Sequence, residues 1–204
     1  MQYIAIAGNI GSGKTTLTKM LSEHFNWIPE FESTADNPYL EDFYKDMSRW
    51  AFHAQVRFLD NSFQQMLDLK DAPKSIIQDR SFDENAYIFA KNLHASGIMD
   101  DRDFESYWKL FKSMSSQLPK PDLLIYLDTD YERLIAQIQK RGRSYEQTIP
   151  EDYLKGLNTL YNQWIDQYSG PLLRIKMSDY DFVEKSVDFY RIVNQIDENL
   201  SVTK

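Results

Sequence analysis

The feature that most constrains this chain is a glycine-rich stretch that directly follows an early apolar run, Tyr3–Ala7. The stretch, Gly8-Asn9-Ile10-Gly11-Ser12-Gly13-Lys14-Thr15, matches the pattern G-x-x-x-x-G-K-[ST], and apolar residues at helical spacing follow it. In such a strand, turn and helix, backbone N–H groups and the positive end of the helix dipole converge on an anion. The motif therefore predicts an α/β fold with a site for a nucleoside triphosphate.

The same motif assigns contacts with ATP and its Mg²⁺ ion. Lys14 is expected at the β- and γ-phosphates and Thr15 at the metal. A glycine-rich turn that precedes Lys-Thr by chance is the alternative, and a phosphate loop alone leaves a kinase, a hydrolase and a switch open. The residues of this stretch that are predicted to contact ATP are Gly8, Asn9, Ile10, Gly11, Ser12, Gly13, Lys14, Thr15 and Thr16.

Short apolar runs predict the rest of the sheet. Each is bounded by turn residues or followed by a helical pattern, as expected for strands buried on both faces. Their alternation with helical segments predicts a five-stranded parallel sheet surrounded by helices, in one domain over residues 1–204. The expected strands are Tyr3–Ala7, Ser75–Gln78, Leu123–Leu127, Leu172–Met177 and Trp27–Phe31, the last interrupted by Pro29. The helical patterns run from Asn37 to Lys70, from Phe82 to Ala95, from Asp101 to Gln117 and from Pro150 to Tyr168.

Charge and composition argue against several classes of partner. The 23 Lys and Arg residues against 31 Asp and Glu give a net charge of −8, whereas binding to nucleic acid polymers or anionic membranes needs a basic surface. The absence of Cys excludes disulfides, zinc–thiolate sites and cysteine nucleophiles. No apolar stretch reaches the roughly 18 residues of a membrane-spanning helix, and no targeting segment is recognised. A soluble cytoplasmic protein is expected.

A second acidic residue is expected at the end of a neighbouring strand, where it helps to hold Mg²⁺. Asp79 and Asp128 each follow an apolar run. Asp128 begins a group of acids suited to the start of a helix, so helix capping is its favoured interpretation. Asp79 is followed by Arg80, and an acid beside an arginine at a strand end can serve metal and phosphate together, with a local ion pair as the alternative. Asp79 is therefore the predicted metal ligand.

Two arginines follow the helical stretch from Tyr131 to Lys140. The sequence Arg141-Gly142-Arg143 suits a glycine-hinged lid, over about residues 140–149, that clamps triphosphate oxygens during transfer. Basic residues that stabilise a helix C-terminus are the alternative. The phosphate loop makes the lid the favoured interpretation.

Three polar residues are candidates for the acceptor side. Glu32 follows the expected strand at Trp27–Phe31 and is placed to accept a proton from an attacking hydroxyl, unless it is an exposed loop residue. Tyr44 and Gln55 are eleven residues apart, nearly three turns of one helix, and so are expected on one face. Gln55 offers its amide to a nucleobase, unless it is a surface residue of a core helix.

Taken in order, these residues resemble the deoxynucleoside kinase family, in particular its bacterial deoxyadenosine/deoxyguanosine kinase branch. The resemblance covers nearly the whole chain. It rests on an ordered set of short motifs: Gly8–Thr15, Asn37-Pro38-Tyr39-Leu40, Phe43-Tyr44-Lys45-Asp46, Arg49-Trp50 with Phe52 and Gln55, Asp79-Arg80-Ser81, and Arg141-Gly142-Arg143 with Glu146.

The resemblance implies a role for each matched residue. Glu32 is the general base for the sugar 5′-hydroxyl, with Arg80 as its electrostatic neighbour. The remaining implied contacts are Tyr44 and Glu146 with the 3′-hydroxyl, Gln55 and Phe89 with the base, Asp181 and Phe182 with the donor adenine, and Thr15 and Asp79 with Mg²⁺. The resemblance also implies a homodimer formed through helices.

Three positions depart from the family pattern. Ser33 follows Glu32 where the family often has Glu-Pro, and Gln137 stands where an arginine is frequent. Asn85 stands where many members carry an aspartate that binds the nucleobase. Because an amide both donates and accepts hydrogen bonds whereas a carboxylate only accepts them, Asn85 leaves the base preference open.

The implied reaction moves the γ-phosphoryl group of Mg·ATP to the 5′-hydroxyl of deoxyadenosine or deoxyguanosine. Lys14, Arg80, Arg141 and Arg143 are expected to offset the charge that develops on the transferred group. A nucleoside monophosphate kinase of the thymidylate kinase type is one alternative, and it needs further basic contacts for the acceptor phosphate. A nucleotide-dependent switch is another, but the Asn-Lys-x-Asp and Asp-x-x-Gly motifs of guanine switches do not occur. A subunit that needs a sister chain is a third.

Overall fold

The computed structural model describes residues 1–32, 36–69, 72–143, 146–147 and 149–202. Within these ranges the chain forms a five-stranded sheet in the order β2-β3-β1-β4-β5, and all neighbouring strands are parallel. The predicted α/β fold is confirmed, and β1 has the predicted bounds. The strands are β1 (Tyr3–Ala7), β2 (Ile28–Glu30), β3 (Ile76–Asp79), β4 (Leu123–Asp128) and β5 (Leu172–Lys176).

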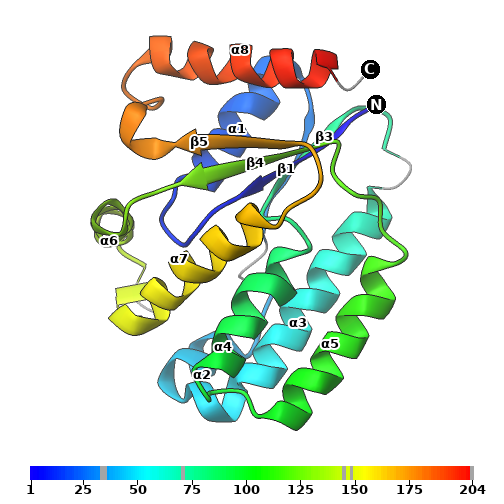
Figure 1. The fold of residues 1–204 in the computed structure, drawn as a ribbon, viewed down its shortest axis with the longest axis vertical. Coiled ribbons are helices and arrows are strands. Elements are labelled where there is room, and N and C mark those ends of the chain that lie inside the picture. Colours follow the sequence, from blue (N-terminus) through cyan, green and yellow to red (C-terminus); the bar gives the residue numbers. More distant parts are fainter. Residues whose placement is uncertain (33–35, 70–71, 144–145, 148, 203–204) are drawn as a thin grey trace.

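Helices cover both faces of the sheet (Figure 1). Helices α1 (Lys14–Phe25) and α8 (Ser186–Val202) lie on one face. The other face carries α3 (Met47–Asp68), α4 (Lys91–Ala95), α5 (Asp101–Ser115) and α7 (Glu151–Asp166). Shorter elements are α2 (Leu40–Lys45), the π-helix η1 (Asn85–Ala90), α6 (Tyr131–Arg141) and the 3₁₀ turn η3 (Met177–Asp179). Among the described residues, no helix has the length and apolar character to cross a membrane.

The central strand β1 shows why the sheet is covered twice. Its residues alternate between the faces: Ile4 and Ile6 belong to the apolar cluster of α1 and α8, while Tyr3, Ala5 and Ala7 belong to the cluster that contains α3 and α7. Every residue of β1 is therefore buried. The arrangement fixes the carboxyl end of β1, from which the glycine-rich loop leaves the sheet.

Two helical features differ from the sequence-based expectation. The pattern from Asn37 to Lys70 contains two helices, because the backbone turns at Asp46 (φ −144°, ψ 84°) and the Asp46 carboxylate accepts a hydrogen bond from the Arg49 N–H. Helix α8 was not among the expected helices. Exposed polar residues interrupt its apolar pattern. Its buried residues nevertheless recur at helical spacing: Phe189, Ile192, Val193, Ile196 and Leu200.

Candidate active site

The glycine-rich loop joins β1 to α1 as predicted. Gly11 and Gly13 have φ angles of 85° and 97°, in the left-handed region that glycine adopts without strain. A side chain at Gly11 would place its Cβ 2.8 Å from the carbonyl oxygen of Leu134. No side chain of the described residues caps the start of α1. The first N–H groups of this helix are therefore available to an anion.

Lys14 lies over this loop. Its Nζ donates hydrogen bonds to the carbonyl oxygens of Gly8 (2.7 Å) and Asn9 (3.1 Å). Burial lowers the pKa of Lys14, and the carboxylates of Asp79 and Glu84 oppose this decrease. A phosphate group offers the partly buried ammonium group charged acceptors, which are stronger than these two carbonyls.

The predicted metal pair, Thr15 and Asp79, lies together at the ends of α1 and β3. The Thr15 hydroxyl donates to Oδ2 of Asp79 at 2.5 Å, and Asp79 is 4% exposed. Its Oδ1 is buried and has no hydrogen-bond partner within the described residues. No group of three or more His, Asp or Glu residues in that part of the chain is arranged for metal binding. A hydroxyl and one carboxylate suit Mg²⁺, which takes most of its oxygen ligands from water and phosphates.

The capping interpretation of Asp128 was wrong. Asp128 is the last residue of β4, and its Oδ2 accepts a hydrogen bond from Nε of Arg174 at 3.0 Å. Asp130, two positions later, occupies the N-cap position of α6. Asp128 is thus paired with β5, whereas Asp79 contacts Thr15 at the end of the phosphate loop.

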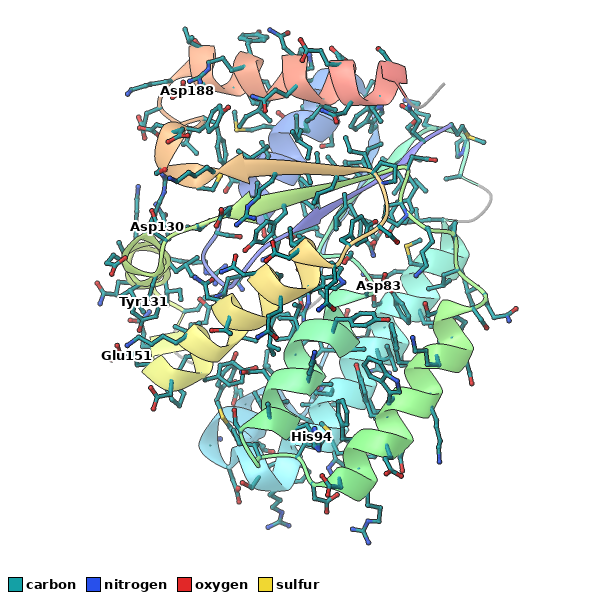
Figure 2. All side chains as sticks on the ribbon, in the orientation of Figure 1. Asp83, His94, Asp130, Tyr131, Glu151 and Asp188 are labelled. Atoms are coloured by element: carbon teal, nitrogen blue, oxygen red, sulfur yellow. The ribbon has the colours of Figure 1, made fainter. Side chains whose placement is uncertain are left out.

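A first cavity, called here the donor cavity, opens on one side of the phosphate loop. Gly11, Ser12, Gly13 and Thr16 line it. The predicted adenine contacts Asp181 and Phe182 also line it, within the segment that follows β5. Figure 2 shows Asp188 at the beginning of α8, where its Oδ2 accepts a hydrogen bond from the N–H of Asp181 (2.9 Å).

Arg133 of α6 was not predicted from sequence. It lines the donor cavity and donates hydrogen bonds to the carbonyl oxygens of Met177 and of Tyr180, the latter at 3.0 Å. One helical turn later, Gln137 lines the same cavity. Arg133 thus orders the segment that carries Asp181, and nothing in its sequence neighbourhood indicates this long-range contact.

A second cavity, the acceptor cavity, also borders the phosphate loop, at Ile10, Gly11, Lys14 and Thr15. It brings together residues from distant parts of the sequence, including all the predicted substrate-binding residues except Asn85. The lining residues are Ile10, Gly11, Lys14, Thr15, Phe31, Glu32, Leu40, Phe43, Tyr44, Gln55, Phe58, Asp79, Arg80, Phe89, Arg141, Arg143, Glu146 and Tyr153.

Glu32 and Arg80 form an ion pair in the acceptor cavity, with Nη1 of Arg80 donating to Oε1 of Glu32. Arg80 is 8% exposed, and its guanidinium carbon lies 3.6 Å from the centre of the Phe89 ring. Its φ of 76° is strained for a residue with a side chain, which is common at functional sites. Burial lowers the pKa of Arg80, but a guanidinium group remains charged. Nε and Nη2 of Arg80 have no partner among the described residues.

The prediction that Tyr44 and Gln55 share a face of one helix was wrong. Tyr44 belongs to α2 and Gln55 to α3, on opposite sides of the turn at Asp46. Both nevertheless line the acceptor cavity, because the turn folds α2 against α3. Gln55 is 2% exposed, and its Oε1 has no hydrogen-bond partner in the described part of the chain.

Asn85 lies outside the acceptor cavity, in a recess that shares Glu32, Phe58, Asp79 and Arg80 with it. Nδ2 of Asn85 donates to the carbonyl oxygen of Phe82 (3.2 Å). The amide therefore keeps Oδ1 as an acceptor, the function that an aspartate would provide at this position. Phe89, one turn later in η1, lines the acceptor cavity itself.

The two lid arginines contact one carboxylate. Arg141 donates to Glu146 through Nε (2.8 Å to Oε2) and Nη2 (2.5 Å to Oε1), and Nη1 of Arg143 lies 3.3 Å from Oε1. Gly142 between them has a φ of 69° and ends α6 as a left-handed cap. Residues 144, 145 and 148 of the predicted lid, and Ser33, lie outside the described residues.

The donor and acceptor cavities meet at the phosphate loop, since Gly11 lines both. The acceptor cavity also holds a carboxylate, Glu32, and several cationic side chains. A loop that serves two cavities in this way suits the transfer of a phosphoryl group from a nucleotide to a second small molecule. Fold and site thus define a P-loop phosphotransferase.

Comparison with known proteins specifies the family of this phosphotransferase. The family model of deoxynucleoside kinases matches residues 4–201, and the chain belongs to the deoxynucleoside kinase family, as its motifs predicted. The deoxyadenosine/deoxycytidine kinase of Bacillus subtilis (strain 168) is 37% identical over 196 residues, which are 95% of this chain and 90% of that protein. A deoxyguanosine kinase of Lactobacillus johnsonii is 35% identical over 206 residues, with 96% and 91% of the two chains covered.

Solved structures agree with this assignment. The structure of deoxyadenosine kinase from M. mycoides with the products dCMP and a flexible dCDP bound has a TM-score of 0.86 to this chain. The two are 29% identical, and the match covers 96% of this chain and 99% of the other. The predicted fold and the predicted ATP-dependent kinase activity are confirmed.

Proposed function

We propose that this kinase phosphorylates the 5′-hydroxyl of a purine 2′-deoxynucleoside, deoxyadenosine or deoxyguanosine. The observation that carries the proposal is the position of Glu32, whose carboxylate lines the acceptor cavity together with Lys14 and Thr15 of the phosphate loop. Similar proteins named as deoxyadenosine and deoxyguanosine kinases support the choice of purines.

Glu32 acts as the general base. It accepts the proton of the 5′-hydroxyl as the sugar oxygen attacks the γ-phosphorus, and the bond to the β-phosphate oxygen breaks. Arg80 orients this carboxylate through their ion pair. Nε and Nη2 of Arg80, which have no partner within the described residues, are donors for the phosphoryl oxygens.

Thr15 and Asp79 would hold Mg²⁺ through the hydroxyl and the carboxylate that contact each other. When bound, the metal ion offsets negative charge on the phosphates. The chain contributes few ligands of its own, and the free Oδ1 of Asp79, unpartnered in the described part of the chain, fits a ligand to the ion or to one of its water molecules.

Sugar and base are held on the far side of the acceptor cavity. Tyr44 and Glu146 bind the 3′-hydroxyl, Gln55 hydrogen-bonds to the base, and Phe89 stacks on the base. Arg141 and Arg143 turn from Glu146 to the phosphates when ATP binds, since both line the acceptor cavity together with Lys14. Closure of this lid excludes water from the transferred group.

A homodimer formed through helices and a cytoplasmic location complete the proposal. Both rest on the family resemblance. Light scattering at several protein concentrations measures the mass in solution, and the mass of a single chain at every concentration would contradict the dimer.

The test of the proposed function is transfer of radiolabelled γ-phosphate from ATP to each of the four natural deoxynucleosides, and to dAMP and dTMP. Deoxyadenosine or deoxyguanosine is expected to give the highest kcat/KM. Faster transfer to dAMP or dTMP would favour the thymidylate kinase alternative, and faster transfer to deoxycytidine or thymidine would overturn the purine assignment.

A further inference from the structure

Glu84 is a fully buried carboxyl group to which neither the motif analysis nor the proposed mechanism gives a role. It is 0% exposed and lines neither the donor cavity nor the acceptor cavity. Oε1 accepts a hydrogen bond from the N–H of Gly8 at 3.2 Å, and Oε2 accepts one from the N–H of Ser81 at 2.6 Å. Gly8 begins the phosphate loop, and Ser81 directly follows Asp79 and Arg80. One side chain thus joins the donor part and the acceptor part of the site.

Tyr161 of α7 completes this connection. Its hydroxyl lies 2.7 Å from Oε1 of Glu84 and 2.8 Å from the carbonyl oxygen of Gly8, and the side chain is 0% exposed. Gly8 is therefore held at both its N–H and its carbonyl group by buried side chains. The same face of α7 holds Asn9, whose Nδ2 donates to Oδ1 of Asn158 (2.9 Å).

A count of protons explains how these contacts coexist. The phenol of Tyr161 has one proton, so it donates to either Glu84 or Gly8, but not fully to both. If Glu84 is protonated, it donates to Tyr161, Tyr161 donates to Gly8, and each contact is a hydrogen bond. Burial raises the pKa of Glu84, although Lys14, Tyr161 and Arg80 act in the opposite direction. With Glu84 ionised, Tyr161 divides its one proton between Oε1 of Glu84 and the carbonyl oxygen of Gly8, and in either state the three groups form one buried hydrogen-bond network.

We propose that Glu84 and Tyr161 are positioning residues for phosphoryl transfer, which fix the phosphate loop relative to the strand end that carries Asp79 and Arg80. The inference rests on the proposed function. Lys14 contacts the same carbonyl oxygen of Gly8 as Tyr161 does. A shift of Gly8 moves both the loop N–H groups and the resting place of the ammonium group, and misplacement by about 1 Å can cost about 10²-fold in rate.

The first experiment compares Tyr161→Phe with Tyr107→Phe in the full-length protein. Each change removes one fully buried hydroxyl, but the Tyr107 hydroxyl has no hydrogen-bond partner in the described part of the chain. Tyr161→Phe is expected to raise KM for ATP about fivefold and to lower kcat about tenfold, with KM for the deoxynucleoside within about twofold of wild type. Tyr107→Phe is expected to leave all three constants unchanged.

KM is the decisive quantity, because it does not depend on the fraction of enzyme that is folded, whereas the apparent kcat does. A purely structural role of Tyr161 would lower the melting temperature and the apparent kcat but would not change KM for ATP, and this result would overturn the inference. An equal increase in KM for ATP in Tyr107→Phe would also overturn it, since general loosening of the core would then explain both.

Glu84→Gln tests the carboxyl group itself. Two backbone N–H groups need two acceptor oxygens, and an amide has only one, so the –NH₂ group must face Gly8 or Ser81. We expect kcat to fall at least tenfold, because one of the two hydrogen bonds that hold Gly8 and the segment after Arg80 in place is lost. Unchanged kcat and KM in folded Glu84→Gln would contradict the proposal, and if this variant does not fold, Tyr161→Phe decides alone.

Binding of ADP, measured by calorimetry, separates the two levels of inference. If the wild-type protein transfers phosphate to no deoxynucleoside, the proposed function fails, but the phosphate loop still binds ADP. Weaker ADP binding by Tyr161→Phe than by Tyr107→Phe, by about fivefold, then supports the positioning role. Equal affinities would overturn it.

Discussion

The donor and acceptor sides of the site are assembled in different ways. On the donor side, the phosphates meet one continuous stretch, Gly8–Thr16, whose backbone N–H groups and helix dipole do most of the binding. The acceptor cavity takes side chains from the loop after β2, from α2, α3, β3, η1 and the lid. An anion can thus be bound by the backbone of one short segment. A sugar and a base are bound by a cavity whose side chains come from several separate segments.

This contrast predicts how substitutions separate the two substrates. A change in the phosphate loop should act on ATP and on the chemical step, whereas a change in α2 or α3 should act on the deoxynucleoside alone. Four substitutions test the contrast, beginning with the largest expected effect.

Lys14→Ala removes the ammonium group that contacts Gly8 and Asn9. We expect kcat/KM for ATP to fall by about 10³-fold, because this partly buried charge stabilises the transferred phosphoryl group. KM for the deoxynucleoside should change little. Lys19→Ala, at an exposed position of the same helix, is the control and should match wild type. A loss smaller than about tenfold would contradict the role of Lys14.

Glu32→Gln keeps the size of the side chain but removes its basicity. We expect kcat to fall by about 10²-fold while deoxynucleoside binding is retained. The control is Glu30→Gln, two residues earlier in β2, since Glu30 lines neither cavity. Steady-state kinetics with both substrates measures the effect, and near-normal turnover would remove Glu32 from the role of base.

Gln55→Leu removes an amide whose Oε1 is buried without a partner in the described part of the chain. KM for the deoxynucleoside should rise about tenfold and KM for ATP should stay constant. The melting temperature should not fall, because loss of an unsatisfied buried polar group does not destabilise the free enzyme. Gln64→Leu, at an exposed position of the same helix, is the control. A rise in KM for ATP as large as the rise for the deoxynucleoside would contradict the separation of the donor side from the acceptor side.

Asp188→Asn weakens the hydrogen bond from the N–H of Asp181, which lines the donor cavity together with Asp188. A threefold rise in KM for ATP is about what one weakened hydrogen bond gives. The N–H of Asp181 and the guanidinium group of Arg191 hold the pKa of Asp188 below its usual range. The folded state therefore gains stability from ionised Asp188 at neutral pH, and this gain is lost as the pH falls through the lowered pKa.

The melting temperature of wild type should thus exceed that of Asp188→Asn at pH 7, and the difference should shrink in acid. Asp197→Asn, at an exposed position of α8, is the control, and its melting temperature should match that of wild type at pH 7. A difference that grows in acid would assign the effect to another group.

Sequence patterns predicted the parts of this protein that depend on neighbouring residues. The apolar runs located all five strands of the described sheet to within a few residues. In β1 and β4, burial on both faces leaves few polar positions, whereas the edge strands β2 and β5 keep exposed residues and were located by their shorter apolar runs. The pattern failed at Asp46, where one capping hydrogen bond replaces a continuous helix by two. It also failed for Asp128, which pairs with Arg174 of β5 rather than capping the next helix. Each error reflects a side-chain contact that helical or strand periodicity does not encode.

The acceptor residues were found through family resemblance rather than through periodicity. Spacing placed Tyr44 and Gln55 on one helix, and they face one cavity only because α2 folds back on α3. Arg133 and Glu84 had no sequence signal, since the contacts that matter, of Arg133 with Met177 and of Glu84 with Gly8 and Tyr161, join residues more than forty positions apart in the chain.

By itself, the sequence determined the phosphate loop, the parallel sheet and the acid at the end of β3. These depend on local backbone chemistry: glycine at left-handed φ angles, N–H groups at a helix start, and apolar residues in short runs. Only the tertiary structure decided which side chains enclose the acceptor and how Glu84 and Tyr161 hold Gly8. The physical reason is that a hydrogen bond or a cavity wall forms when packing brings distant segments within a few ångströms, and packing depends on the whole chain at once.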